Sequence, residues 1–164
     1  MNNKEQFVSF SHYGSHKGFY REDDLSSALF NIHYEDFFEA PDDEDFPYYS
    51  AHELLRGSCH HFVLGLQKIF GYTPYIIEGN NKVGFHAFSQ IYKNKKWFYI
   101  DARGITTSFD DFMEVAREFV SDEYTIRRLD EQEKEELIKD DMYFEEAQAF
   151  AVAVIKKYKE YYTL

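Results

Sequence analysis

The stretch YIIEGNNKVGFHAFSQIYKNKKWFYID, residues 75–101, decides the fold class. It contains three runs of aromatic and β-branched residues, at 75–78, 83–92 and 97–101, separated by the polar segments 79–82 and 93–96. Runs of this composition predict strands, and connections as short as these join antiparallel neighbours. We therefore expect residues 75–101 to form a three-stranded antiparallel meander.

The residues before the meander predict a helix that packs on it. In SCHHFVLGLQKIFG, residues 58–71, apolar side chains recur at helical spacing at Phe62, Leu66 and Ile69. Ser58 is expected to cap the start of this helix, and Gly71 to end it in the left-handed conformation. Cys59, the single cysteine of the chain, then lies in the first turn.

Helical patterns also occur on both sides of this core. We expect helices over residues 24–39 and 106–119, the second capped by Ser108 with Asp111 as the acid of a capping box. Residues 131–162 predict a helical region broken near 140–141. Its apolar stripe comprises Phe144, Ala147, Ala151, Val154 and Ile155.

The expected fold class is α+β, with the cysteine-bearing helix packed on an antiparallel meander sheet and further helices near both termini. Residues 124–129 predict a fourth strand, and residues 1–20 an irregular arm or a short hairpin. We expect a single domain over residues 1–164, with its core at about 52–120, an acidic N-terminal arm at about 1–50 and a C-terminal helical region at about 130–164.

The composition narrows the function classes. A formal net charge of −12 argues against direct nucleic-acid binding, which depends on Lys and Arg contacts to phosphate. The chain shows no secretory signal pattern and no apolar run of the roughly 20 residues that span a bilayer, so we expect no membrane partner. A lone cysteine makes no internal disulfide, and a cytoplasmic location is expected.

Three residues are placed for nucleophilic chemistry: Cys59, His86 and Asp101. A helix N-terminus lowers a thiol pKa, because it presents unpaired amide groups and the positive end of the helix dipole. A turn at 93–96 brings position 86 close to 102 or 103 in the neighbouring strand, so Asp101 could reach the ring of His86. An acid there would orient the imidazole and stabilise its charged form.

This order resembles the transglutaminase-like superfamily, which includes the arylamine N-acetyltransferases and is related to papain-like proteases. The likeness rests on RGSCHHF around Cys59, FHAFSQIY around His86 and KWFYIDARG around Asp101, and it covers about residues 56–104. It implies a Cys59 nucleophile, a His86 base and an orienting Asp101, acting without a cofactor in acyl transfer or amide hydrolysis. A deamidase, transglutaminase or protease-like enzyme acting on a protein or peptide is the expected function.

Other residues near this constellation are candidates for substrate contact. Arg103, directly after Asp101, could bind a substrate carboxylate, and Trp97 and His60 are further candidates. A metal site formed by Cys59, the adjacent histidines and His86 is not expected, because neighbouring helical side chains point about 100° apart and rarely ligate one ion.

An alternative function follows from the acidic runs. Residues 21–45 hold ten acidic residues against one arginine, which is usually a solvated surface. The same pattern would suit a non-catalytic interaction or inhibitor protein that covers a basic partner surface in the place of nucleic acid.

Overall fold

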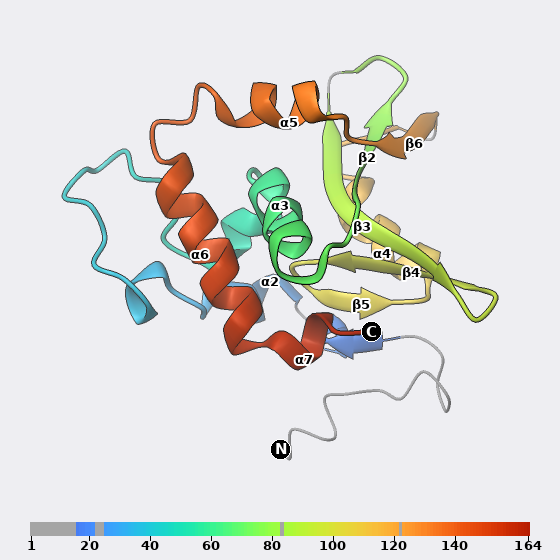
Figure 1. Ribbon diagram of the computed structural model, residues 1–164, viewed down its shortest axis with the longest axis horizontal. Coiled ribbons are helices and arrows are strands. Elements are labelled where there is room, and N and C mark those ends of the chain that lie inside the picture. The colour runs from blue at the N-terminus through green and yellow to red at the C-terminus, as the bar shows by residue number, and fades with distance from the viewer. Residues whose placement is uncertain (1–15, 22–24, 83, 122) are drawn as a thin grey trace.

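The computed structural model describes residues 16–21, 25–82, 84–121 and 123–164, and it has the expected α+β fold (Figure 1). Its six-stranded sheet is antiparallel and has the order β1-β5-β4-β3-β2-β6. The strands are β1 His16–Gly18, β2 Pro74–Gly79, β3 Phe85–Lys93, β4 Lys96–Asp101, β5 Gly104–Thr106 and β6 Tyr124–Arg128. The α-helices are α2 Leu25–Phe30, α3 Cys59–Phe70, α4 Phe109–Ala116, α5 Glu131–Ile138, α6 Phe144–Lys157 and α7 Lys159–Tyr162. Short 3-10 helices occupy Phe19–Arg21, Tyr34–Asp36 and Ala51–Leu54.

The meander of β2, β3 and β4 is confirmed, with the expected register. Gln90 lies opposite Tyr99, and Tyr92 lies opposite Trp97. The connection is tighter than expected, because only Asn94 and Lys95 separate the strands, with φ values of 53° and 64°. Two consecutive positive φ values are typical of the turn that matches the twist of a two-residue hairpin.

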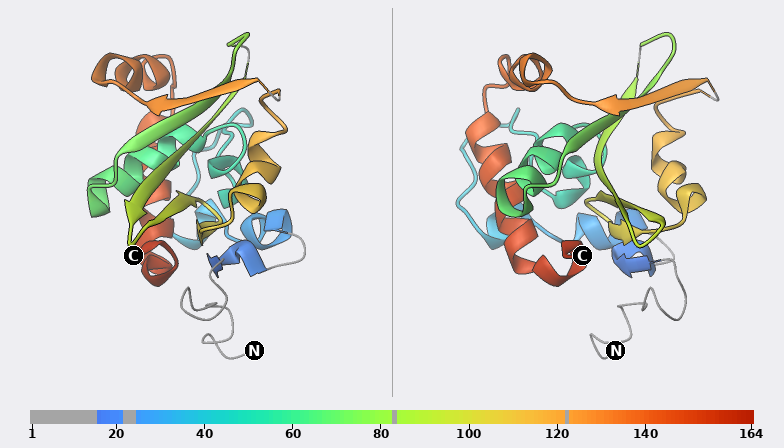
Figure 2. Two further views of the ribbon diagram at one scale, coloured as in Figure 1. Left: turned by 90° about the vertical axis from the view of Figure 1, so that its right-hand side faces the viewer. Right: turned by 45° about the vertical axis from the view of Figure 1, so that its right-hand side comes forward.

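Helices cover both faces of the sheet (Figure 2). Helix α3 packs on one face and α6 packs against α3, and Phe62, Leu66 and Phe150 belong to the same buried cluster as Ile100. The helix α4 packs on the other face, where Phe112 contacts the aromatic side chains of β3 and β4. Both helix α3 and its end at Gly71 are confirmed, since Gly71 has a φ of 74°. The expected side-chain cap from Ser58 is absent, and the Ser58 carbonyl instead accepts from the amide of His61.

The N-terminal half departs from expectation. Helix α2 ends at Phe30, because the backbone beyond it pairs with a later segment: the amide of Tyr34 donates to the carbonyl of Tyr49 at 2.8 Å, and the amide of Ala51 donates to the carbonyl of Ile32 at 2.9 Å. Several side chains of this segment are buried in the main core: Leu29, Ile32, Tyr34, Phe46 and Tyr48. The acidic segment is therefore part of the core rather than a separate arm.

Strands β1 and β5 were not predicted as a pair. Gly104, with a φ of 118°, opens β5, and a Cβ at this position would lie 2.1 Å from the carbonyl oxygen of Lys17 in β1. This close backbone approach joins residues 16–18 to the sheet edge, so they form neither an irregular arm nor a hairpin. Residues 1–15 lie outside the described part of the chain.

The C-terminal region largely follows the prediction. The break near 140–141 separates α5 from α6, and β6 occupies most of 124–129. The stripe on α6 is confirmed at Ala147, Ala151, Val154 and Ile155, which are fully buried. Phe144 was wrongly included, since it is 39% exposed and Phe150 fills the core in its place.

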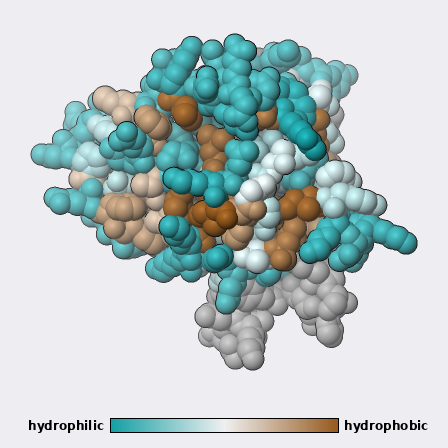
Figure 3. All heavy atoms as spheres, in the orientation of Figure 1, coloured by the Kyte–Doolittle hydropathy of each residue, from teal (hydrophilic) through white to brown (hydrophobic). Residues whose placement is uncertain are grey.

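No residue of α5 is buried, and hydrophilic side chains line the upper edge of the molecule where α5 lies (Figure 3). Over the described residues, none of the helices has both the length and the apolar character needed to cross a bilayer.

Candidate functional site

The structure brings Cys59, His86 and Asp101 together where β3 extends beyond the end of β4. Pairing between these strands starts at Ser89 opposite Ile100, and β4 ends at Asp101. The backbone amide of Ala87 donates to the Sγ atom of Cys59 at 3.3 Å. The first turn of α3 is thereby joined to the start of β3.

His86 is held by Asp101 at one nitrogen of its ring. The Nε2 atom of His86 lies 3.0 Å from Oδ2 of Asp101, and the two side chains are 0% and 3% exposed. The rings of Phe88 and Phe112 pack near the imidazole, with centroids 6.3 Å and 5.8 Å from its own. The other nitrogen, Nδ1, is buried and has no hydrogen-bond partner. The Asp101 contact therefore fixes the ring and leaves Nδ1 for proton exchange.

The thiol and the imidazole have pKa values displaced in opposite directions. Burial raises the pKa of Cys59, but interactions with His60 and His86 and the Ala87 amide outweigh it and lower the pKa to about 6. Burial lowers the pKa of His86, but interactions with Asp101 and Cys59 raise it to about 9. Near neutral pH, these values favour a thiolate beside an imidazolium. Each of the two side chains contributes to the displacement of the other's pKa, so they interact in this conformation.

His60 is a second imidazole beside the thiol. It is half-buried, its Nδ1 atom has no hydrogen-bond partner, and its interaction with Cys59 contributes to the lowered pKa of the thiol. The structure therefore places His60 next to Cys59, and its predicted contact with a substrate stays a prediction.

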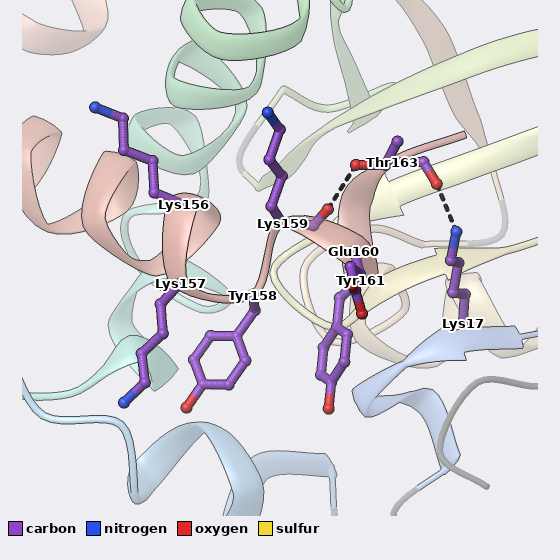
Figure 4. A pocket seen from close by; sticks show the side chains of 8 residues that line it. All are labelled: Lys17, Lys156, Lys157, Tyr158, Lys159, Glu160, Tyr161 and Thr163. Carbon is purple, nitrogen blue, oxygen red and sulfur yellow. Dashed lines mark hydrogen bonds between the residues drawn. The ribbon is translucent and has the colours of Figure 1, made fainter. Parts of the chain in front are cut away.

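The site is closed in this conformation. Cys59 is 5% exposed and His86 is fully buried. A hollow of about 680 Å³ lies elsewhere, between the end of α6, α7 and β1 (Figure 4). It is lined by Lys17, Lys156, Lys157 and Lys159 among others, and their side chains point in different directions. Another molecule would therefore reach Cys59 only if neighbouring side chains or backbone moved.

The structure does not place Arg103 and Trp97 as expected. Arg103 is fully buried and binds Asp101 with its guanidinium, so it presents no charge to a substrate carboxylate. Trp97 is 43% exposed and packs against Tyr92, with ring centroids 5.2 Å apart. Tyr92 lies at the far end of β3 from His86, about 20 Å away at the usual rise per strand residue. Trp97 therefore lies outside the candidate site.

Sequence reasoning missed a polar network beside the cysteine. The His61 ring is fully buried, with Nε2 2.7 Å from Oδ2 of Asp141 and Nδ1 2.9 Å from Nε2 of Gln148. The hydroxyl of Tyr48 donates to the same Asp141 oxygen. This network joins the first turn of α3 to the segment between α5 and α6. The only signal in the sequence is a histidine on the apolar side of a helix, and its partner lies 80 residues away.

The donor set does not form a metal centre. Within residues 16–21, 25–82, 84–121 and 123–164, no group of three or more His, Cys, Asp or Glu side chains is arranged to hold an ion.

In comparisons with known proteins, no family model, curated protein or solved structure matches the chain. The likeness to transglutaminase-like enzymes therefore stays a prediction that rests on Cys59, His86 and Asp101.

Proposed function

We propose that this protein is a thiol-dependent enzyme that transfers acyl groups or hydrolyses amides on a protein or peptide. The observation that carries the proposal is the geometry at Cys59: a sulfur at a helix start, bonded by the Ala87 amide, beside an imidazole whose other nitrogen is fixed by Asp101. A buried thiol that served only packing would need neither a charged partner nor an oriented histidine.

The proposed chemistry uses the chain's own residues. The Cys59 thiolate attacks the carbonyl carbon of an amide and forms a tetrahedral oxyanion, with the backbone amide of Cys59 as one donor to it. The imidazolium of His86 gives its proton to the leaving nitrogen, which departs as ammonia or an amine and leaves a thioester. His86 then takes a proton from water or from an acceptor amine as that group attacks the thioester and releases Cys59. Asp101 holds the ring throughout.

The proposal is tested by incubating the full chain with peptides rich in glutamine and asparagine, with and without an acceptor amine. We expect ammonia release, together with a Cys59-linked acyl intermediate in intact-mass spectra. Cys59→Ser should abolish both signals and Trp97→Ala should leave both unchanged, since Trp97 lies far from the sulfur. If Cys59→Ser releases ammonia at the wild-type rate, the proposed function is wrong.

A second candidate function is the binding of a basic protein surface. Its supporting observation is that exposed aromatic side chains lie among the acids of the N-terminal half: Phe30, Phe38 and Tyr49 are 50%, 38% and 45% exposed. Hollows lined by Glu35 and Asp36 adjoin Phe38 and Tyr49. This function predicts salt-sensitive capture of a lysine-rich polypeptide that persists in Cys59→Ser. Replacing Asp42, Asp43, Glu44 and Asp45 by Asn or Gln should abolish it, and capture indifferent to salt and to these changes would exclude it.

A further inference from the structure

Arg103 is buried directly behind the candidate site. It is 0% exposed, and its Nη2 atom lies 2.7 Å from Oδ2 of Asp101, the same oxygen that contacts His86. Its Nε atom donates to Oδ1 of Asp101 at 3.1 Å, and its backbone amide donates to Oδ1 at 3.0 Å. The Asp101 carboxylate is thus bound on one side by a guanidinium and on the other by an imidazole.

The remaining surface of the Arg103 guanidinium is also occupied by protein. Nη1 donates to the carbonyl of Asp111 at 3.1 Å and Nη2 to the carbonyl of Phe112 at 2.9 Å. The ring of Tyr20 lies against the guanidinium, with its centroid 4.6 Å from Cζ. The amide of Phe19 donates to the Arg103 carbonyl at 2.7 Å. Arg103 is therefore fixed by β4, by α4 and by the segment after β1.

With Cys59 as a thiolate and His86 as an imidazolium, the four buried side chains form a row of alternating charge: Arg103 positive, Asp101 negative, His86 positive and Cys59 negative. A single uncompensated charge is costly to bury, whereas this row is neutral in sum. Burial raises the pKa of Asp101, but Arg103 and His86 hold it well below its usual range. Tyr20, Glu114 and Glu118 also interact with Arg103. Tyr20 and Tyr162 also interact with Asp101, and His60 interacts with Cys59.

We propose that Arg103 is a positioning residue of the candidate site, and that its buried charge balances Asp101 so that Cys59 can exist as a thiolate. This inference rests on the proposed function. It assigns Arg103 no contact with substrate: the residue acts through Asp101 and His86.

Loss of the Arg103 charge leaves a net negative charge among the three remaining groups. Proton uptake relieves that charge, and the group that takes the proton most readily is Cys59, because the pKa of Asp101 is far lower. The thiol of Arg103→Met should therefore titrate above its wild-type pKa. Arg103→Lys keeps the charge and should keep the thiol closer to its wild-type pKa.

The experiment measures the rate of iodoacetamide alkylation against pH, which reports one thiol because the chain has a single cysteine. We expect a midpoint near 6 for the wild type, the pKa of Cys59. In Arg103→Met the midpoint should rise by about two units, a roughly tenfold fall in thiolate at neutral pH. Arg117→Met is the matched control, because the Arg117 side chain is 54% exposed and pairs with Asp110 on the surface. It should leave the midpoint unchanged.

The outcomes separate the two proposals. A wild-type midpoint near 9 contradicts the proposed function, and this inference falls with it. A wild-type midpoint near 6 that is unchanged in Arg103→Met overturns the role of Arg103 alone. If Arg103→Met does not fold, Arg103→Gln decides, because glutamine removes the charge and keeps a hydrogen-bond donor. A midpoint raised by about two units supports the inference, and a midpoint equal to that of the wild type overturns it.

Discussion

Acidification should destabilise the fold through His61, which lies two residues after Cys59 in helix α3. Burial, and next the nearby His60, lower the His61 pKa from 6.5 to about 4, although Asp141 raises it. The unfolded chain therefore binds more protons than the native protein between these two values, so stability rises with pH across that window. The contribution is complete above 6.5 and is lost as the pH falls to about 4. A displacement of this size corresponds to about 3 kcal/mol.

The variant His61→Gln isolates this effect, because glutamine keeps polar contacts to Asp141 and Gln148 but does not titrate. Between neutral pH and a pH of about 4, the free energy of unfolding measured with urea should fall by about 2–3 kcal/mol more for the wild type than for His61→Gln. His33→Gln is the control, since His33 is exposed and lies outside this network, and it should follow the wild type. Parallel stability curves for the wild type and His61→Gln would refute the reasoning that His61 is buried as a neutral ring.

Further predictions concern the site and the sheet edge. His86→Ala should move the alkylation midpoint of Cys59 from about 6 toward its usual 9.0. The midpoint is more diagnostic than the rate, since thiolate nucleophilicity falls with pKa. Asp101→Asn should lower stability at neutral pH by about 3 kcal/mol, since it leaves a buried guanidinium unpaired. Asp101→Asn should also make the free energy of unfolding depend less on pH in the acid range, as measured by chemical unfolding. A carboxyl with a depressed pKa stabilises the fold at a pH above its usual pKa of 3.8, and this contribution is lost as the pH falls. Gly104→Ala should lower the stability of the fold by more than about 2 kcal/mol, because its Cβ collides with the β1 backbone. Gly71 also has a positive φ but no atom within 4 Å of an added Cβ, so Gly71→Ala should lower the stability by about 1 kcal/mol in the same thermal-melting series.

Local patterns were sufficient to predict the central part of the fold. The alternation in 75–101 and its two polar turns predicted the three strands, and the turn at 93–96 also predicted the register of β3 against β4, because a short connection leaves few ways to pair. The helix that ends at Gly71 was equally predictable, since its apolar stripe and the glycine after it both indicate the same helix. The proximity of His86 and Asp101 followed from this register, whereas that of Cys59 was implied by the resemblance to transglutaminase-like enzymes.

Features that depend on distant pairing were not predictable. Strand β1 exists because Gly104 admits the backbone of Lys17 closely, and no local pattern indicates such a contact. Helix α2 stops early because residues 32–34 pair with 49–51. Arg103 was expected to contact substrate because its partners outside its own loop, on α4 and after β1, could not be inferred from sequence.

The most direct test of the account is the titration of the Cys59 thiolate. Thiolate absorbs in the far ultraviolet, and subtracting the spectrum of Cys59→Ser isolates the signal of the single cysteine. We expect a midpoint near 6, with thiolate already dominant at neutral pH. A midpoint near the usual value of 9.0 would contradict it, because Cys59 would then be a buried thiol without an ion-pair partner.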